Sequence, residues 1–167
     1  SQRVSGTGHI TTITYNREEK LNSLNAVGIQ ELHEAFISLL NDEDLRAIIL
    51  TGAGSKAFFG GADIFEMSEL DSDGARNFIT SLHKLFLTIR THPVPVIARI
   101  NGYTLGAGME LAAACDLRIS TNTAIFGMPE VRVGLPSVIE AALLPRLIGW
   151  GKSNYLVLTA ENINATT

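Results

Sequence analysis

The sequence is poor in the residues that cross-link secreted domains and bind metals. Its 167 residues include a single cysteine, Cys115, so no disulfide can form within the chain. The four histidines are scattered and show no metal-ligand spacing, so no metal site is expected. One unpaired cysteine is typical of a protein from a reducing, intracellular compartment.

Basic charge and long apolar runs are also scarce. Lys and Arg number 13 against 17 Asp and Glu, for a net charge of −4, and the basic residues form no cluster. Phosphate binding needs a basic surface, so nucleic acid is not an expected partner. No apolar run approaches the about 20 residues of a membrane-spanning helix, so no membrane partner is expected. The apolar fraction of 46% is typical of one globular domain with a substantial core.

Strand and helix patterns alternate along the chain, which predicts an α/β architecture. Asn25 and Asp63 are expected to be N-caps, and Ser137 is expected to cap a helix over residues 138–147. Apolar or β-rich segments predict strands at residues 9–15, 45–50, 94–100 and 116–120. Helices are predicted at residues 25–40, 64–70, 71–90, 108–115, 138–147 and 152–159, and those at 25–40 and 71–90 have a one-sided apolar stripe.

Two glycine-containing turns follow predicted strands, at Gly60-Gly61-Ala62 and Gly106-Ala107-Gly108. Small residues let backbone N–H groups approach a ligand closely, and unpaired N–H groups at a helix start favour an anion. Two such donors converging on one oxygen form an oxyanion hole, a device worth about 3 kcal/mol per donor. Either turn alone is more often an ordinary tight turn.

Two glutamates follow the second turn. Glu110 would lie about one turn into an otherwise apolar helix, and Glu130 follows Pro129 in an irregular segment. Two carboxylates near a polarised carbonyl suit proton transfer next to that carbonyl, and burial would tune one of them toward neutral pH. The simpler alternatives are that Glu110 compensates the helix dipole and that Glu130 is a solvated loop residue.

Four motifs and a shorter segment together resemble the crotonase family, the enoyl-CoA hydratases and isomerases. They occur in the family's order and with compatible spacing over nearly the whole chain. They are residues 16–25 (NREEKLNSLN), 57–64 (AFFGGADI), 100–112 (INGYTLGAGMELA), 126–130 (FGMPE) and the pair Cys115-Asp116.

The resemblance implies a crotonase-like superhelix, a spiral of repeated ββα units, and a role for each matching residue. The backbone N–H groups of Ala62 and Ala107 would form the oxyanion hole for an acyl-CoA thioester. Glu110 and Glu130 would be the catalytic pair. The residues implied to bind CoA and substrate are Ala62, Asp63, Ile64, Phe65 and Ala107.

The implied activity is 2-enoyl-CoA hydration, with two alternatives. One is a Δ3,Δ2-enoyl-CoA isomerase that uses Glu130 as its base, and the other is a non-catalytic or RNA-binding member of the same fold. A serine hydrolase on this fold is disfavoured because no convincing Ser/His pair is present. No metal or redox cofactor is implied, since CoA arrives as part of the substrate. Such enzymes are intracellular: cytoplasmic in bacteria, mitochondrial or peroxisomal in eukaryotes.

The sequence departs from the family pattern in three places. Residues 134–140 are shorter and less glycine-rich than the corresponding hydratase loop, and Ala107 replaces a commoner glycine. The family also continues into a C-terminal helical segment that helps to assemble a trimer. Residues 1–167 are therefore expected to be an acyl-CoA-binding catalytic core without that segment, from a homo-oligomer (a trimer or a dimer of trimers).

Overall fold

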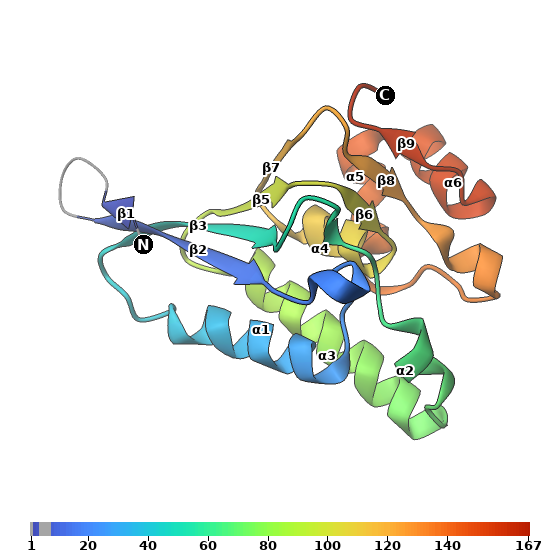
Figure 1. The fold of residues 1–167 in the computed structure, drawn as a ribbon, viewed down its shortest axis with the longest axis horizontal. Coiled ribbons are helices and arrows are strands. Elements are labelled where there is room, and N and C mark those ends of the chain that lie inside the picture. The colour runs from blue at the N-terminus through green and yellow to red at the C-terminus, as the bar shows by residue number, and fades with distance from the viewer. Residues whose placement is uncertain (1, 4–7) are drawn as a thin grey trace.

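The computed structural model of the protein describes residues 2–3 and 8–167 and contains two β-sheets (Figure 1). The larger sheet has the order β1-β2-β3-β5-β7, and its neighbouring strands are parallel except for β1 and β2. Its strands are β1 (Gln2–Arg3), β2 (His9–Tyr15), β3 (Leu45–Gly52), β5 (Val96–Ile100) and β7 (Leu117–Ser120).

The smaller sheet has the order β4-β6-β8-β9, with β4, β6 and β8 parallel and β9 antiparallel. Its strands are β4 (Ala57–Phe59), β6 (Tyr103–Leu105), β8 (Ile125–Gly127) and β9 (Ile163–Asn164). Three consecutive pairs, β3/β4, β5/β6 and β7/β8, each give one strand to each sheet. This arrangement is a spiral of ββα turns, so the predicted α/β superhelix is confirmed.

Helices connect the turns of the spiral and cover the sheets. α1 and α3 pack side by side under the larger sheet, and α4 contacts both β4 and β6 of the smaller one (Figure 1). The α-helices are α1 (Ala26–Ser38), α2 (Ile64–Ser68), α3 (Ser72–Arg90), α4 (Ala107–Ala114), α5 (Leu144–Ile148) and α6 (Trp150–Thr159). The 3₁₀ helices are η1 (Glu18–Lys20), η2 (Pro129–Val133) and η3 (Ile139–Leu143).

The core follows from the helix patterns. α3 buries one apolar stripe, in which each large side chain contributes about 1.5–3 kcal/mol; its members are Phe78, Leu82, Leu85, Phe86 and Ile89. All eight residues of α4 are buried, because its small side chains let it lie between neighbouring elements. The predicted N-caps are confirmed: Asn25 accepts from Gly28 N–H, and Asp63 accepts from the amides of Phe65 and Glu66.

The helix predicted over residues 138–147 is wrong. The chain there forms η3 and then the short α5, and Ile139 has a positive φ of 60°. Pro145 would remove a hydrogen bond from the interior of a continuous helix and clash with the preceding turn. Ser137 caps nothing; its hydroxyl donates to the Glu130 carboxylate instead.

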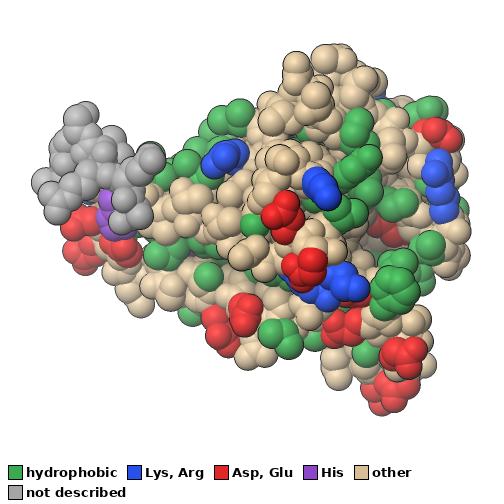
Figure 2. Space-filling view, viewed as in Figure 1, with side chains coloured by type: hydrophobic (Ala, Val, Ile, Leu, Met, Phe, Trp, Pro, Cys, Tyr) green, Lys and Arg blue, Asp and Glu red, His purple; other side chains and the backbone are tan. Residues whose placement is uncertain are grey.

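Several short elements also differ from the predictions. The short elements η1, β4 and β6 lie outside the helices and strands predicted from the sequence. Of the helices in the described residues, none has the length and apolar character needed to cross a bilayer. On the face drawn in Figure 2, Lys and Arg side chains are scattered rather than gathered into one patch.

Candidate active site

The site lies where the three parallel strands of the smaller sheet end. β4 is followed by Gly60-Gly61-Ala62, β6 by Gly106 and Ala107, and β8 by the segment that carries Glu130. The carboxyl ends of parallel strands meet at one edge of a sheet, so segments far apart in the sequence are brought together. The pocket formed at this edge has a volume of about 440 Å³.

Ala62 and Ala107 both line this pocket. Ala107 is the first residue of α4, where a helix leaves its N–H groups without an acceptor. Ala62 forms a parallel bridge with Leu24, but that bridge uses the carbonyl of Gly61 and the amide of Asp63. Neither the Ala62 nor the Ala107 amide donates a hydrogen bond to any residue that the structure describes. Both donors are therefore available to a ligand oxygen.

Gly106 is required at the turn before α4. Its φ of 52° and ψ of −122° lie outside the regions that L side chains adopt. A Cβ at this position would also lie 2.6 Å from Oε1 of Glu130. The missing side chain therefore lets the backbone turn and lets the Glu130 carboxylate lie against it.

Glu110 lies on the first turn of α4 and is 4% exposed. Its Oε1 accepts a hydrogen bond of 2.8 Å from the amide of Ala141. Burial raises the pKa of Glu110 to about 8, and the Ala141 hydrogen bond opposes this shift only in part. The negative charges of Glu130 and Glu140 raise this pKa further. Glu110 therefore retains a proton at neutral pH.

Glu130 lies on η2 and faces the same pocket. Its Oε2 accepts a hydrogen bond of 3.2 Å from the Ser137 hydroxyl. Burial also raises the pKa of Glu130, while hydrogen bonds from its own backbone and from Ser137 oppose the shift. A buried carboxyl and a half-buried one that repel each other favour a state in which one carries a proton and the other does not.

The rest of the pocket is apolar. Among the described residues that line it, only Glu110 and Glu130 have polar side chains. α2 and α3 contribute part of the apolar wall, and the chain around η2 and η3 contributes the remainder. Representative members are Ile64, Met67, Ile79, Leu82, Val138 and Ile139. Such a wall suits a hydrocarbon group.

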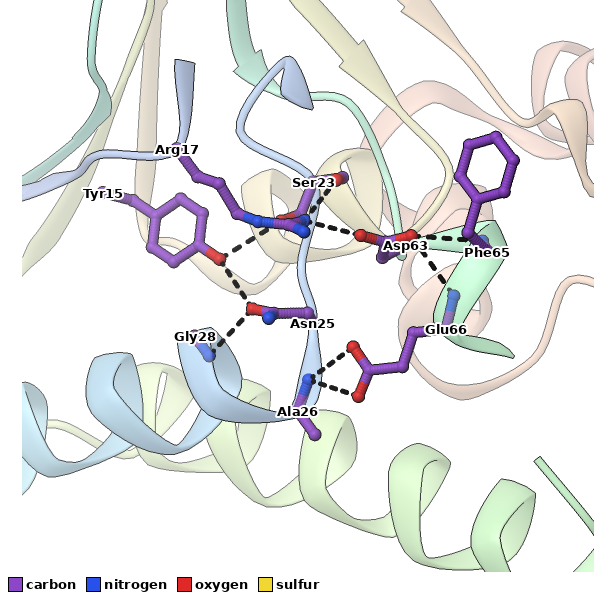
Figure 3. Close-up of polar contacts among 9 residues, drawn as sticks. All are labelled: Tyr15, Arg17, Ser23, Asn25, Ala26, Gly28, Asp63, Phe65 and Glu66. Atoms are coloured by element: carbon purple, nitrogen blue, oxygen red, sulfur yellow. Dashed lines mark hydrogen bonds and ion pairs between the residues drawn. The ribbon is translucent and has the colours of Figure 1, made fainter. Parts of the chain in front are cut away.

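An ion pair fixes the position of the Ala62 turn (Figure 3). Nη1 of Arg17 lies 2.7 Å from Oδ2 of Asp63 and also donates to the Ser23 hydroxyl at 2.8 Å. Burial by itself would raise the pKa of Asp63, but the Arg17 guanidinium and the amides of Glu66 and Phe65 hold it below its usual range. Asp63 is thus a charged cap that ties α2 to the segment after β2.

A second contact joins the same two segments. Both carboxylate oxygens of Glu66, on α2, accept from the amide of Ala26, at 3.2 and 3.3 Å (Figure 3). Backbone hydrogen bonds reinforce it, from Leu24 N–H to Gly61 O and from Asp63 N–H to Leu24 O, both 2.8 Å. The backbone is therefore fixed by hydrogen bonds on both sides of Ala62, at Gly61 and at Asp63.

Comparison with known proteins decides the family. The family model described as enoyl-CoA hydratase/isomerase matches residues 5–167. The chain belongs to the enoyl-CoA hydratase/isomerase family. It is 41% identical over 159 residues to the short-chain-enoyl-CoA hydratase of Clostridium acetobutylicum, covering 95% of this chain and 61% of that protein. It is 40% identical over 157 residues to the crotonyl-CoA hydratase of Syntrophomonas wolfei subsp. wolfei, covering 93% of this chain and 60% of that protein.

A solved member of the family has the same fold. The enoyl-CoA hydratase of Bacillus anthracis superposes with a TM-score of 0.91 at 35% identity. The match covers 99% of this chain and 64% of that structure. The chain spans about three fifths of the length of the two curated relatives.

The structure brings five of the seven predicted site residues to one pocket and leaves two beside it. The Asp63 carboxylate caps α2 and forms an ion pair with Arg17, and the Phe65 ring is 74% exposed. Their predicted contacts with CoA stay predictions. The residues in the pocket are Ala62, Ile64, Ala107, Glu110 and Glu130.

Sequence patterns did not predict the residues that contact and position the site carboxylates. Arg17 and Ser137 contact Asp63 and Glu130, and Ala141 contacts Glu110, each from a different part of the chain. Spacing along the sequence gives no sign of these contacts. Glu140 carried one usable signal, because a charged residue in an apolar stretch is seldom fully buried unless it is paired.

Proposed function

We propose that the protein adds water across the 2,3-double bond of a 2-enoyl-CoA thioester. The observation that carries this proposal is the meeting of Glu110 and Glu130 with two free backbone amides in one apolar pocket. The thioester oxygen would accept hydrogen bonds from Ala62 and Ala107, which stabilise the negative charge that develops as water adds.

The two glutamates divide the proton transfers. Glu110, with its pKa raised to about 8, holds a proton at neutral pH and is suited to deliver it to C2. Glu130 would take a proton from the water whose oxygen bonds to C3. One water is consumed and no electrons change hands, so we propose that no redox cofactor is used. No metal is needed in this scheme either.

The substrate class follows from the lining of the pocket. The wall beyond the two glutamates offers no polar side chain among the described residues, so a plain hydrocarbon acyl group is favoured over one bearing hydroxyl or carboxyl groups. The relatives named for short-chain enoyl-CoA and crotonyl-CoA support the same class.

The CoA portion would leave the pocket past α2. There the exposed Phe65 ring lies 5.7 Å from the Lys20 ammonium. An aromatic face beside a cation suits a nucleotide base and its phosphates.

We also propose that the protein forms a homo-oligomer and is intracellular; relatives from Mus musculus and Dictyostelium discoideum are named as mitochondrial.

The hydratase proposal is tested with crotonyl-CoA and the full-length protein. Loss of the absorbance of the conjugated thioester is expected, and the loss should be abolished in the Glu110→Gln/Glu130→Gln double variant. If crotonyl-CoA stays unchanged, the hydratase proposal is wrong. Acyl-CoA binding without turnover would favour the non-catalytic alternative.

Isomerisation is the second candidate, and in that reaction Glu130 alone would act as the base. A 3-enoyl-CoA would then gain the conjugated absorbance. In that case Glu110→Gln would retain most of the activity and Glu130→Gln would lose it.

A further inference from the structure

A third glutamate, Glu140, lies behind the pocket and is only 3% exposed. It belongs to η3, which packs against both α3 and α4. Its Oε1 lies 3.1 Å from Nδ1 of His83 and 3.7 Å from Nη1 of Arg90. These two partners are seven residues apart on α3, so they share one face of that helix.

The turn that carries Glu140 is strained and open to the pocket on one side. Ile139 has a φ of 60°, which is rare for a β-branched residue and persists only where surrounding contacts enforce it. Val138 and Ile139 line the pocket, and the next amide after Glu140, that of Ala141, donates to Glu110. On the side that faces α3, the contacts of Glu140 with His83 and Arg90 anchor this turn.

We propose that Glu140 is a positioning residue for Glu110: by tethering η3 to His83 and Arg90 on α3, it holds the Ala141 amide against the Glu110 carboxyl. Oε2 of Glu140 is buried and has no hydrogen-bond partner among the described residues. A buried carboxylate with one oxygen unsatisfied is costly to the fold, so a role in the site accounts for its presence better than stability does. This inference rests on the proposed function, because it assigns Glu110 a role in turnover.

Two substitutions separate the tether from its charge. Glu140→Ala removes the contact with α3, whereas Glu140→Gln keeps an oxygen that can accept from His83. Glu140→Ala should lower kcat for crotonyl-CoA by about 10- to 100-fold with little change in KM, since misplacing a catalytic group by 1 Å has effects of this size. Glu140→Gln should retain most of the activity. Asp42→Ala is the matched control, because it breaks another His–carboxylate pair of 3.1 Å, that with His9, and should leave kcat unchanged.

Two further measurements distinguish positioning from a general loss of structure. In a Glu110→Gln background, Glu140→Ala should cause no additional loss of kcat, because the group it positions is already gone. Amide hydrogen exchange at Ala141 should accelerate in Glu140→Ala and stay slow in Glu140→Gln, and this readout does not depend on activity. If the parent protein fails to hydrate crotonyl-CoA, the proposed function fails while the exchange result still tests the tether. Unchanged kcat and unchanged Ala141 exchange in Glu140→Ala, or an equal loss of kcat in both backgrounds, would overturn the inference.

Discussion

Gly106 offers the sharpest test of how the site is assembled. Its lack of a side chain lets the backbone turn and also leaves room for the Glu130 carboxylate. In Gly106→Ala, the new Cβ would lie 2.6 Å from Oε1 of Glu130, about 0.8 Å short of the 3.4 Å at which ordinary contact begins. The Glu130 carboxyl must therefore move by about 0.8 Å. Misplacing a catalytic group by about 1 Å can lower the rate by about 100-fold. We expect kcat to fall by about 100-fold.

The substitution also strains the backbone, and that effect needs its own control. Holding an alanine at φ 52° and ψ −122° should lower the free energy of unfolding by about 1–3 kcal/mol. Gly149 is a matched position, since its φ of 80° and ψ of 156° are equally unsuited to alanine and a Cβ there meets nothing within 4 Å. Gly149→Ala should therefore lose a similar amount of stability and keep its kcat.

The assay combines urea unfolding with turnover of crotonyl-CoA. The expected pattern is a similar loss of stability in both variants and a loss of kcat in Gly106→Ala alone. If Gly106→Ala retained the kcat of the parent while losing stability, the contact between Gly106 and Glu130 would have no catalytic importance. The reasoning from close approach would then be refuted.

Three further predictions concern the carboxyls and the oxyanion donors. Glu110→Gln and Glu130→Gln should each lower kcat for hydration by orders of magnitude, with much smaller changes in KM; a nearly silent Glu110→Gln would contradict hydration and support isomerisation. Ala107→Pro deletes one donor at the first helical position, where proline is structurally tolerated, so kcat should fall by about 100- to 1000-fold in a folded protein, while Ala62→Gly keeps its N–H and should stay active. A circular dichroism spectrum of Ala107→Pro checks that α4 persists, and full activity in that variant would place the donor elsewhere. Because the pKa of Glu110 is raised from 4.5 to about 8 in the folded state, its contribution to stability is fully present below pH 4.5 and is lost as the pH rises toward and past 8. Glu110→Gln should therefore flatten the decline in Tm between pH 5 and pH 8, and a decline identical to that of the parent would show that Glu110 is not buried in its neutral form.

Part of this structure was predictable from local patterns. The burial of Glu110 followed from a carboxylate placed among small apolar residues one turn into a helix, and the caps Asn25 and Asp63 followed from residue type and position. The long stripe of α3 specified its own length and buried face. These features depend on residues close together in the sequence.

Other features depend on contacts that the sequence pattern does not contain. β4 and β6 have three residues each, too few to show a period of two, so the sequence pattern does not predict them as strands. Glu140 meets His83 across 57 positions of the sequence, and Arg17 meets Asp63 across two segments that only the fold brings together. Ser137 has the residue type of a helix cap, but its hydroxyl contacts Glu130, because Pro145 prevents the helix that it would have capped.

The alternation of strands between the two sheets has a consequence for folding. One turn of the spiral contributes Ala62 to the site, the next contributes Ala107 and Glu110, and the third contributes Glu130. No single turn therefore contains a functional part of the site. Contacts between sequence-distant segments form late, because the loops between them must close first. A refolding chain should therefore regain its helical signal before it regains turnover. The delay between the two would measure the stacking of the third turn on the first two.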